Sequence, residues 1–118
     1  MKRVDWDETR LPDGMRRYTG DVKEINSIES VGKITKYYQL HGPGTAWYHD
    51  GRVYEGYFRE GEYHGDGKLV QTGPNGWEYK GKFFNGAFSR YGFLRTQRLQ
   101  YRGSFSNGKF HGQVFATN

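Results

Sequence analysis

Residues 54–67 read YEGYFREGEYHGDG, a stretch that interleaves four glycines with four aromatic residues. Glycine is normally a weak choice inside a β-strand, because it loses the most backbone freedom and has no side chain to pack. Tyr54, Gly56 and Phe58 lie two residues apart, so in a strand all three would belong to one face of a sheet. We expect aromatic rings on this face to lie against the glycine backbone of the next strand, which would offset the cost of the glycines.

The pattern recurs along the chain. The template Y-x-G-x-F-x-x-G comprises Tyr54, Gly56, Phe58 and Gly61, then Tyr79, Gly81, Phe83 and Gly86, then Tyr101, Gly103, Phe105 and Gly108. Each copy continues into a second half, whose template glycines include Gly65, Gly67 and Gly92. Arg90 and Val114 stand where that half should have glycine. A weaker copy begins at Tyr18 and rejoins the pattern at His41.

Each copy predicts one β-hairpin. Gly61, Gly86 and Gly108 follow polar residues in short segments that are typical of hairpin turns with positive φ. A single hairpin buries too little surface to be stable, so successive hairpins must stack on one another. We therefore predict an all-β fold, an elongated, twisted antiparallel sheet of about eight strands.

The run GPGTAWYHDGRVYEGYFREGEYHGDGKLV, residues 42–70, resembles the MORN repeat (membrane occupation and recognition nexus). That family pattern has a G-x-G half, a D/N-G turn and a Y-x-G-x-F-x-x-G half. The match covers residues 41–115 and, more loosely, residues 14–22. The resemblance implies stacked hairpins, a cytoplasmic location, and a role as a scaffold or adaptor in cytoskeletal, ciliary or membrane-associated assemblies.

Two segments depart from the repeat. We divide the chain into an N-terminal capping segment, residues 1–17, and a repeat array, residues 18–118, which is interrupted by an insertion at residues 23–40 and is clearer from residue 41 onward. Residues 4–17 are interpreted as a degenerate strand at the end of the array. The insertion could form an extended hairpin or a short helix. Its β-branched residues and Gly32 favour the hairpin.

Composition narrows the functional classes. The chain has no cysteine, which excludes disulfides and thiolate catalysis. Its N-terminus, MKRVDWDETR, lacks the apolar core of a secretion signal, and no apolar run approaches the ~18 residues of a membrane-spanning helix. The net charge of +5 admits acidic partners, such as acidic protein surfaces, anionic lipids or nucleic acid.

We expect no enzymatic activity, no cofactor and no metal. The carboxylates near one hairpin could be imagined as an acid and base pair, but a solvated turn is the simpler interpretation; they are Asp50, Glu55, Glu60, Glu62 and Asp66. His41, His64 and His111 share one repeat position, which places successive copies ~10 Å apart, two strands away. Because that separation is too large for shared metal ligation, we interpret these histidines as structural.

The face opposite the Tyr-Gly-Phe residues carries the candidate partner site. A plain solvated face would hold only small or charged residues, whereas this one combines aromatic rings with cations. The candidate partner-binding residues are Trp47, Tyr57, Lys80, Lys82, Phe84, Tyr91, Phe93, Arg95 and Arg102. The alternative is that residues 1–40 fold over this face and bury it.

These features together predict a protein–protein interaction module that docks through the aromatic and basic face. Binding of anionic phospholipid headgroups is one alternative, although the chain shows neither an amphipathic helix nor a dense Lys/Arg cluster. Binding of single-stranded nucleic acid is a further alternative, because aromatics interleaved with cations can stack bases. It would need a more concentrated positive charge. Self-association through open sheet edges is also compatible with the pattern.

Overall fold

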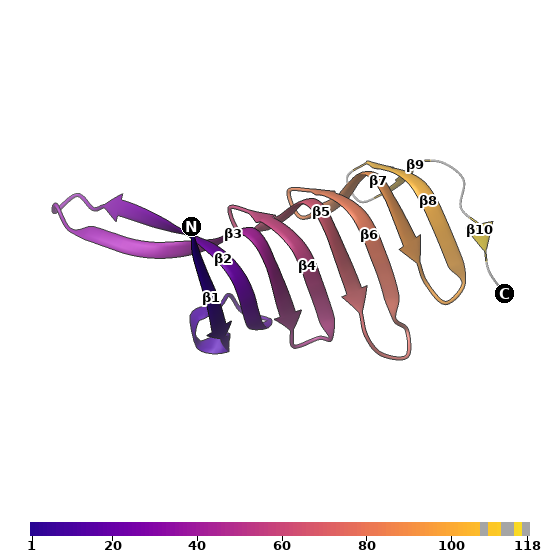
Figure 1. Ribbon diagram of the computed structural model, residues 1–118, viewed down its shortest axis with the longest axis horizontal. Coiled ribbons are helices and arrows are strands. Elements are labelled where there is room, and N and C mark those ends of the chain that lie inside the picture. Colours follow the sequence, from indigo (N-terminus) through magenta and orange to yellow (C-terminus); the bar gives the residue numbers. More distant parts are fainter. Residues whose placement is uncertain (107–108, 112–114, 117–118) are drawn as a thin grey trace.

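The computed structural model describes residues 1–106, 109–111 and 115–116 and consists of one open antiparallel sheet (Figure 1). Its elements are β1 (Lys2–Asp7), the 3-10 helix η1 (Glu8–Arg10), β2 (Met15–Ile28), β3 (Ile34–Tyr48), β4 (Arg52–Arg59), β5 (Glu62–Gln71), β6 (Trp77–Phe84), β7 (Ala87–Arg95), β8 (Leu99–Ser106), β9 (Lys109–His111) and β10 (Phe115–Ala116). Strands β1 to β8 follow one another across the sheet, and the short β9 and β10 both pair with β8. The predicted all-β sheet of stacked hairpins is confirmed.

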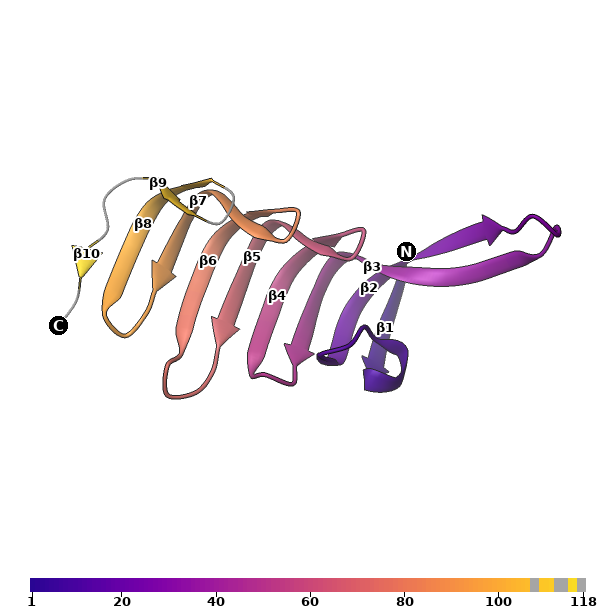
Figure 2. The same ribbon diagram turned by 180° about the vertical axis from the view of Figure 1, so that it is seen from behind.

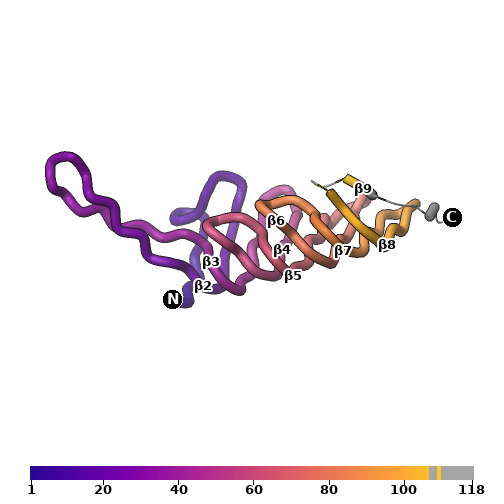
Figure 3. Tube along the Cα trace, turned by 90° about the horizontal axis from the view of Figure 1, so that it is seen from above, coloured from indigo at the N-terminus to yellow at the C-terminus, as the bar shows by residue number. Residues whose placement is uncertain are grey.

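The molecule is long and narrow, with extents of 60 × 26 × 22 Å. Successive hairpins lie side by side along the long axis, so that chain order and spatial order coincide, as the views from the front and from behind agree (Figures 1 and 2). Figure 3, seen from above, shows the strands crossing the long axis obliquely as the sheet twists.

The insertion forms the favoured hairpin. Strands β2 and β3 stay paired from Lys23 opposite Gln39 to Ile28 opposite Ile34, beyond the point where β1 and β4 stop pairing with them. This two-stranded ribbon projects from the N-terminal end of the array (Figure 3). Three apolar side chains near its tip, Ile28, Val31 and Ile34, are exposed, and 82% of the surface of Val31 is accessible. The ribbon therefore extends away from the sheet instead of folding over it.

The first strand lies at the N-terminal edge of the sheet. Strand β1 pairs with β2 from Lys2 opposite Val22 to Asp7 opposite Arg17. The chain then leaves the sheet in η1, where the Asp7 carboxylate accepts a hydrogen bond from the Thr9 backbone N–H at 3.0 Å. The segment predicted as a degenerate strand over residues 4–17 is thus a strand that starts earlier and a short 3-10 turn.

The tyrosine of each template packs on glycine, as predicted. Tyr54 is fully buried, and a Cβ atom added at Gly67 on the neighbouring strand would lie 2.5 Å from the Tyr54 Oη atom. Gly67 itself pairs with Gly56 across β4 and β5. The paired glycines therefore leave the space that the tyrosine ring fills.

The tyrosine hydroxyl closes the unit by donating a hydrogen bond to a backbone carbonyl three residues further on. The same bond occurs in four repeats: Tyr18 to Asp21 at 2.6 Å, Tyr54 to Tyr57 at 2.6 Å, Tyr79 to Lys82 at 2.7 Å and Tyr101 to Ser104 at 2.7 Å. Because the ring is removed from water, burial raises the pKa of Tyr79 to about 12.

Aromatic contacts join each repeat to the next. The phenylalanine of a template meets the tyrosine of the preceding template edge to face, and these pairs are Tyr18–Phe58, Tyr54–Phe83 and Tyr79–Phe105, with centroids 5.5, 5.2 and 5.2 Å apart. Within a repeat the tyrosine also stacks on the first aromatic residue of the return strand, as Tyr79 does on Phe88 at 3.9 Å. Such geometries are favourable for aromatic quadrupoles, so the core is a continuous row of rings.

The hairpin turns add a second link between repeats. Glu60 and Gly61 both have positive φ, as do Asn85 and Gly86, which is the signature of a two-residue primed turn. The Gly61 N–H donates to the Leu40 carbonyl of the preceding strand at 2.9 Å, and the Gly86 N–H donates to the Tyr63 carbonyl at 3.0 Å. The predicted positive φ is confirmed for Gly61 and Gly86, and Gly108 lies outside the described residues.

Candidate functional site

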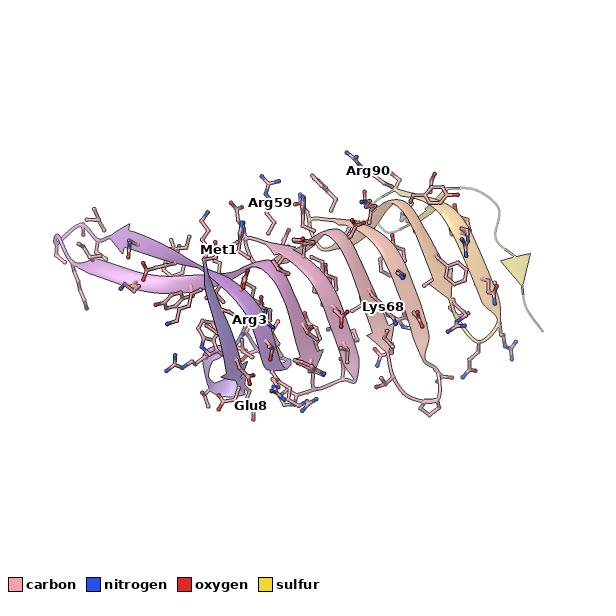
Figure 4. All side chains as sticks on the ribbon, in the orientation of Figure 1. Met1, Arg3, Glu8, Arg59, Lys68 and Arg90 are labelled. Atoms are coloured by element: carbon pink, nitrogen blue, oxygen red, sulfur yellow. The ribbon has the colours of Figure 1, made fainter. Side chains whose placement is uncertain are left out.

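The side of the sheet opposite the buried tyrosines is called here the outer face. Register places its residues in rows that run across the strands. One row consists of direct cross-strand neighbours, Glu55, Lys68, Lys80, Phe93 and Arg102. A second row, interrupted by β-bulges, holds Tyr57, Asp66, Lys82, Tyr91 and Ser104. Lys68 is labelled near the middle of the sheet in Figure 4.

Five of the sequence-predicted residues lie together on β6, β7 and β8. Lys80 and Arg102 stand on either side of Phe93, and the Arg102 guanidinium lies over the Phe93 ring, 4.9 Å from its centroid. Lys82 and Tyr91 occupy the neighbouring row, and 61% of the Tyr91 surface is exposed. We call Lys80, Lys82, Tyr91, Phe93 and Arg102 the docking patch.

The other predicted residues lie outside the docking patch. Trp47 is on β3, under the Arg17 guanidinium, and begins an apolar row with Val53 and Val70. Arg95 is engaged by Glu78 at 3.3 Å.

Two exposed aromatic residues complete the predicted set. Tyr57 is exposed on β4, and Phe84 ends β6 at the hairpin turn, where its ring lies 5.5 Å from that of His64. Val53 and Val70 were not predicted from the sequence, although their phase in the repeat placed them on this face.

The docking patch carries positive charge that its surroundings do not fully neutralise. Lys82 forms an ion pair with Asp66 at 2.6 Å. Among the described residues, no carboxylate lies within ion-pair distance of Lys80 or Arg102. Two cations and one open aromatic ring are therefore available to a partner.

Among the carboxylates and histidines singled out from the sequence, Asp50 and His41 form structural hydrogen bonds, and the side chain of His111 lies outside the described residues. Asp50 accepts a hydrogen bond from the Arg52 backbone N–H at 3.1 Å, and this bond holds the pKa of Asp50 below its usual value. His41 Nδ1 accepts from the Glu60 backbone N–H at 3.1 Å, which ties a hairpin turn to the strand before it. The part of the chain that the structure describes contains no group of three or more His, Asp or Glu side chains placed to hold a metal ion.

A depression at the hairpin-turn edge was not predicted from the sequence. Its volume is about 270 Å³, and we call it the turn-edge pocket. It is lined by Arg59, His64, Gly65, Lys82, Phe83, Phe84, Ser89 and Arg90. Arg59 and Arg90 project from this edge of the sheet (Figure 4). The sequence signal that could have indicated it is Arg90, an arginine where the repeat has glycine.

The N-terminal part of the chain, residues 1–40, does not cover the docking patch. Strand β1 lies beside β2, at the opposite end of the strand order from β6 to β8.

The described residues include no helix that is long and apolar enough to cross a bilayer. No protein-family model matches the chain, and no curated protein matches its sequence significantly.

Proposed function

We propose that this chain is a non-enzymatic protein–protein interaction module, a small MORN-type scaffold or adaptor that docks through the docking patch within a larger assembly. The observation that carries the proposal is the contiguity of Lys80, Phe93 and Arg102 on an uncovered outer face. Tyr91 adds an exposed ring beside them. Aromatic anchors with arginine are the residue types that dominate protein interfaces. A cytoskeletal, ciliary or membrane-associated assembly is proposed on the sequence resemblance alone.

Charge on the outer face favours a protein over an anionic lipid surface. Glu55, Asp66 and Glu78 lie on the same face as the cations of the docking patch. A bilayer rich in anionic lipids attracts a concentrated basic cluster, and each carboxylate near the surface opposes that attraction. A protein surface can instead place its own charges opposite both signs.

The geometry around Phe93 favours a protein over single-stranded nucleic acid. Base stacking requires an open aromatic face, but the Arg102 guanidinium already lies over the Phe93 ring. Tyr91 offers one exposed ring, and the carboxylates of the same face would repel a phosphate backbone.

A capture experiment tests the proposal. The tagged chain and a Tyr91→Ala, Phe93→Ala variant would be incubated in native lysate, beside a Tyr37→Ala control. Tyr37 is an exposed aromatic residue on the projecting ribbon, far from the docking patch in strand order. We expect the wild type and the control to retain the same partner and the double variant to lose it, with unchanged melting temperatures.

The same proteins would be mixed with anionic liposomes and with a single-stranded oligonucleotide at two salt concentrations. Tight binding to either ligand that falls steeply with salt, together with no protein recovered from the lysate, would contradict docking to a protein.

A further inference from the structure

The turn-edge pocket departs from the repeat at three positions. Arg90 has φ of 57°, in the left-handed region, where the equivalent Gly42 and Gly65 have φ of 94° and 70°. Ser89 replaces the histidine that precedes those glycines at residues 41 and 64. A strained residue that no packing demands is a pointer to function. Arg90 lines the pocket at a position where glycine would supply no side chain.

The third departure is His64. Its Nδ1 atom is buried and has no hydrogen-bond partner among the described residues, whereas Nδ1 of the equivalent His41 accepts from the Glu60 N–H. The histidine Nδ1 atom therefore has a hydrogen-bond partner at His41 and none among the described residues at His64, beside the pocket. Buried polar atoms are rarely left without a hydrogen-bond partner, so His64 Nδ1 is a second indication that the pocket is a binding site.

The charges around the pocket define the ligand. Arg59, Lys82 and Arg90 line it, Asp66 pairs with Lys82, and Glu62 lies opposite Arg59 in the β4–β5 ladder. Of the three lining cations, only Lys82 has an ion pair among the described residues, so Arg59 and Arg90 remain available to an anion. A carboxylate needs no more than these two guanidinium groups, whereas a phosphate monoester carries close to two negative charges and would also be repelled by the nearby Asp66 and Glu62 carboxylates. Phe84, 54% exposed, forms an apolar wall.

We propose that the turn-edge pocket binds a single carboxylate group of a protein partner. The guanidinium groups of Arg59 and Arg90 donate to the carboxylate oxygens, and Phe84 contacts the carbon chain that carries them. This inference rests on the proposed function: the docking patch supplies the apolar anchors, and the pocket fixes the register of the partner at the turn edge. Arginine suits the role because its planar fork matches carboxylate geometry.

Binding can be measured on the full chain with N-acetyl-glutamic acid α-amide, which carries one carboxylate, and separately with inorganic phosphate. We expect the carboxylate to produce saturable shifts of the backbone ¹H–¹⁵N resonances of Gly65, Ser89 and Arg90, at lower concentration than phosphate. Arg59→Gln and Arg90→Gly should each weaken binding by roughly tenfold, the usual cost of one hydrogen bond to a charged group. Arg98→Gln, an exposed arginine outside the pocket, is the matched control and should change nothing.

Loss of binding in Arg90→Gly cannot be attributed to unfolding, because glycine relieves the positive-φ strain and should raise the melting temperature. Absence of saturable shifts, tighter binding of phosphate than of the carboxylate, or equal affinity in Arg59→Gln and wild type would each overturn the proposal.

Failure of this inference is distinguishable from failure of the proposed function. Tyr91→Ala, Phe93→Ala should bind the glutamate amide normally, because neither residue lines the pocket. Partner capture that survives Arg59→Gln, Arg90→Gly but is lost in Tyr91→Ala, Phe93→Ala would overturn the pocket while the docking patch stands. Specific binding of the glutamate amide without any captured protein would support the pocket's chemistry and overturn the protein partner.

Discussion

Gly81 on β6 and Gly92 on β7 face one another so closely that a Cβ atom on Gly81 would lie 2.5 Å from the Gly92 Cα and 2.7 Å from the Tyr91 carbonyl oxygen. Both atoms belong to the backbone of a strand that is paired on both sides, so they cannot move aside cheaply. The Tyr79 hydroxyl is 2.8 Å from the same position. Paired glycines are thus a packing requirement of the repeat.

Gly81→Val should therefore lower the free energy of unfolding by about 3 kcal/mol or more, as severe overpacking does. Gly14→Val is the control, because nothing lies within 4 Å of a Cβ atom there and its cost comes only from the positive φ, roughly 1–2 kcal/mol. Urea unfolding of both variants measures the difference. Equal losses of stability would mean that the close approach of β6 and β7 is wrong.

Alkaline pH should destabilise the fold through its buried tyrosines. The pKa of Tyr79 is raised from 10.0 to about 12, first because burial disfavours the phenolate. A group whose folded pKa exceeds its unfolded pKa stabilises the protein fully below the unfolded value and loses that contribution as pH rises toward the folded value. The free energy of unfolding should therefore fall between pH 10 and 12, by roughly 2–3 kcal/mol for this residue.

Tyr79→Phe should flatten this alkaline decline, while Tyr57→Phe, which changes an exposed tyrosine, should leave it unaltered. At neutral pH, Tyr79→Phe should cost about 1 kcal/mol, since the Lys82 carbonyl loses its hydrogen bond. Denaturant titrations at several pH values provide both comparisons. An alkaline transition identical in all three proteins would contradict the burial of Tyr79.

Arg90→Gly should stabilise the protein by about 1 kcal/mol, because it removes the strain of a non-glycine residue with positive φ. Arg59→Gly is the matched comparison on an ordinary strand residue, and it should destabilise by roughly 0.5–1 kcal/mol through lost chain restriction. Thermal unfolding shows whether each substitution raises or lowers the melting temperature. A lower melting temperature for Arg90→Gly would show that the Arg90 side chain contributes more than its backbone costs.

The repeat pattern predicts the fold because it specifies both the residue types that pack together and their alternation along each strand. Tyr54 and Gly67 identify the ring and the space it fills, and alternation assigns every template residue to a face. The distance between two residues across the sheet is harder to predict, because residues assigned to the same face can be several strands apart. Trp47 was therefore grouped with Phe93, although it lies four strands away.

The C-terminal register shows a second limit. Phe93 lies opposite Lys80, but the equivalent Phe115 lies opposite Gln100, two residues along from the Arg102 that the repeat would predict. Val114 stands at the position of Gly92, where a Cβ atom would overlap the tyrosine ring of the preceding strand. Val114 itself lies outside the described residues. The register of β10 against β8 therefore differs from that of the earlier repeats, and the sequence shows only that the pattern is broken near this strand.

Replacing charges in the docking patch should affect docking less than removing its rings. Lys80→Gln, Lys82→Gln leaves Tyr91, Phe93 and the Arg102 guanidinium over the Phe93 ring in place, and central anchors dominate interface energy, whereas rim charges mainly affect the association rate. We expect this charge variant to bind the captured partner with an association rate reduced several-fold and a nearly unchanged dissociation rate, and the Tyr91→Ala, Phe93→Ala variant to lose binding. Surface plasmon resonance at two salt concentrations separates the two rates. A charge variant that loses binding as completely as the aromatic variant, with steep salt dependence in the wild type, would show that the patch recognises an anionic surface instead of an apolar one.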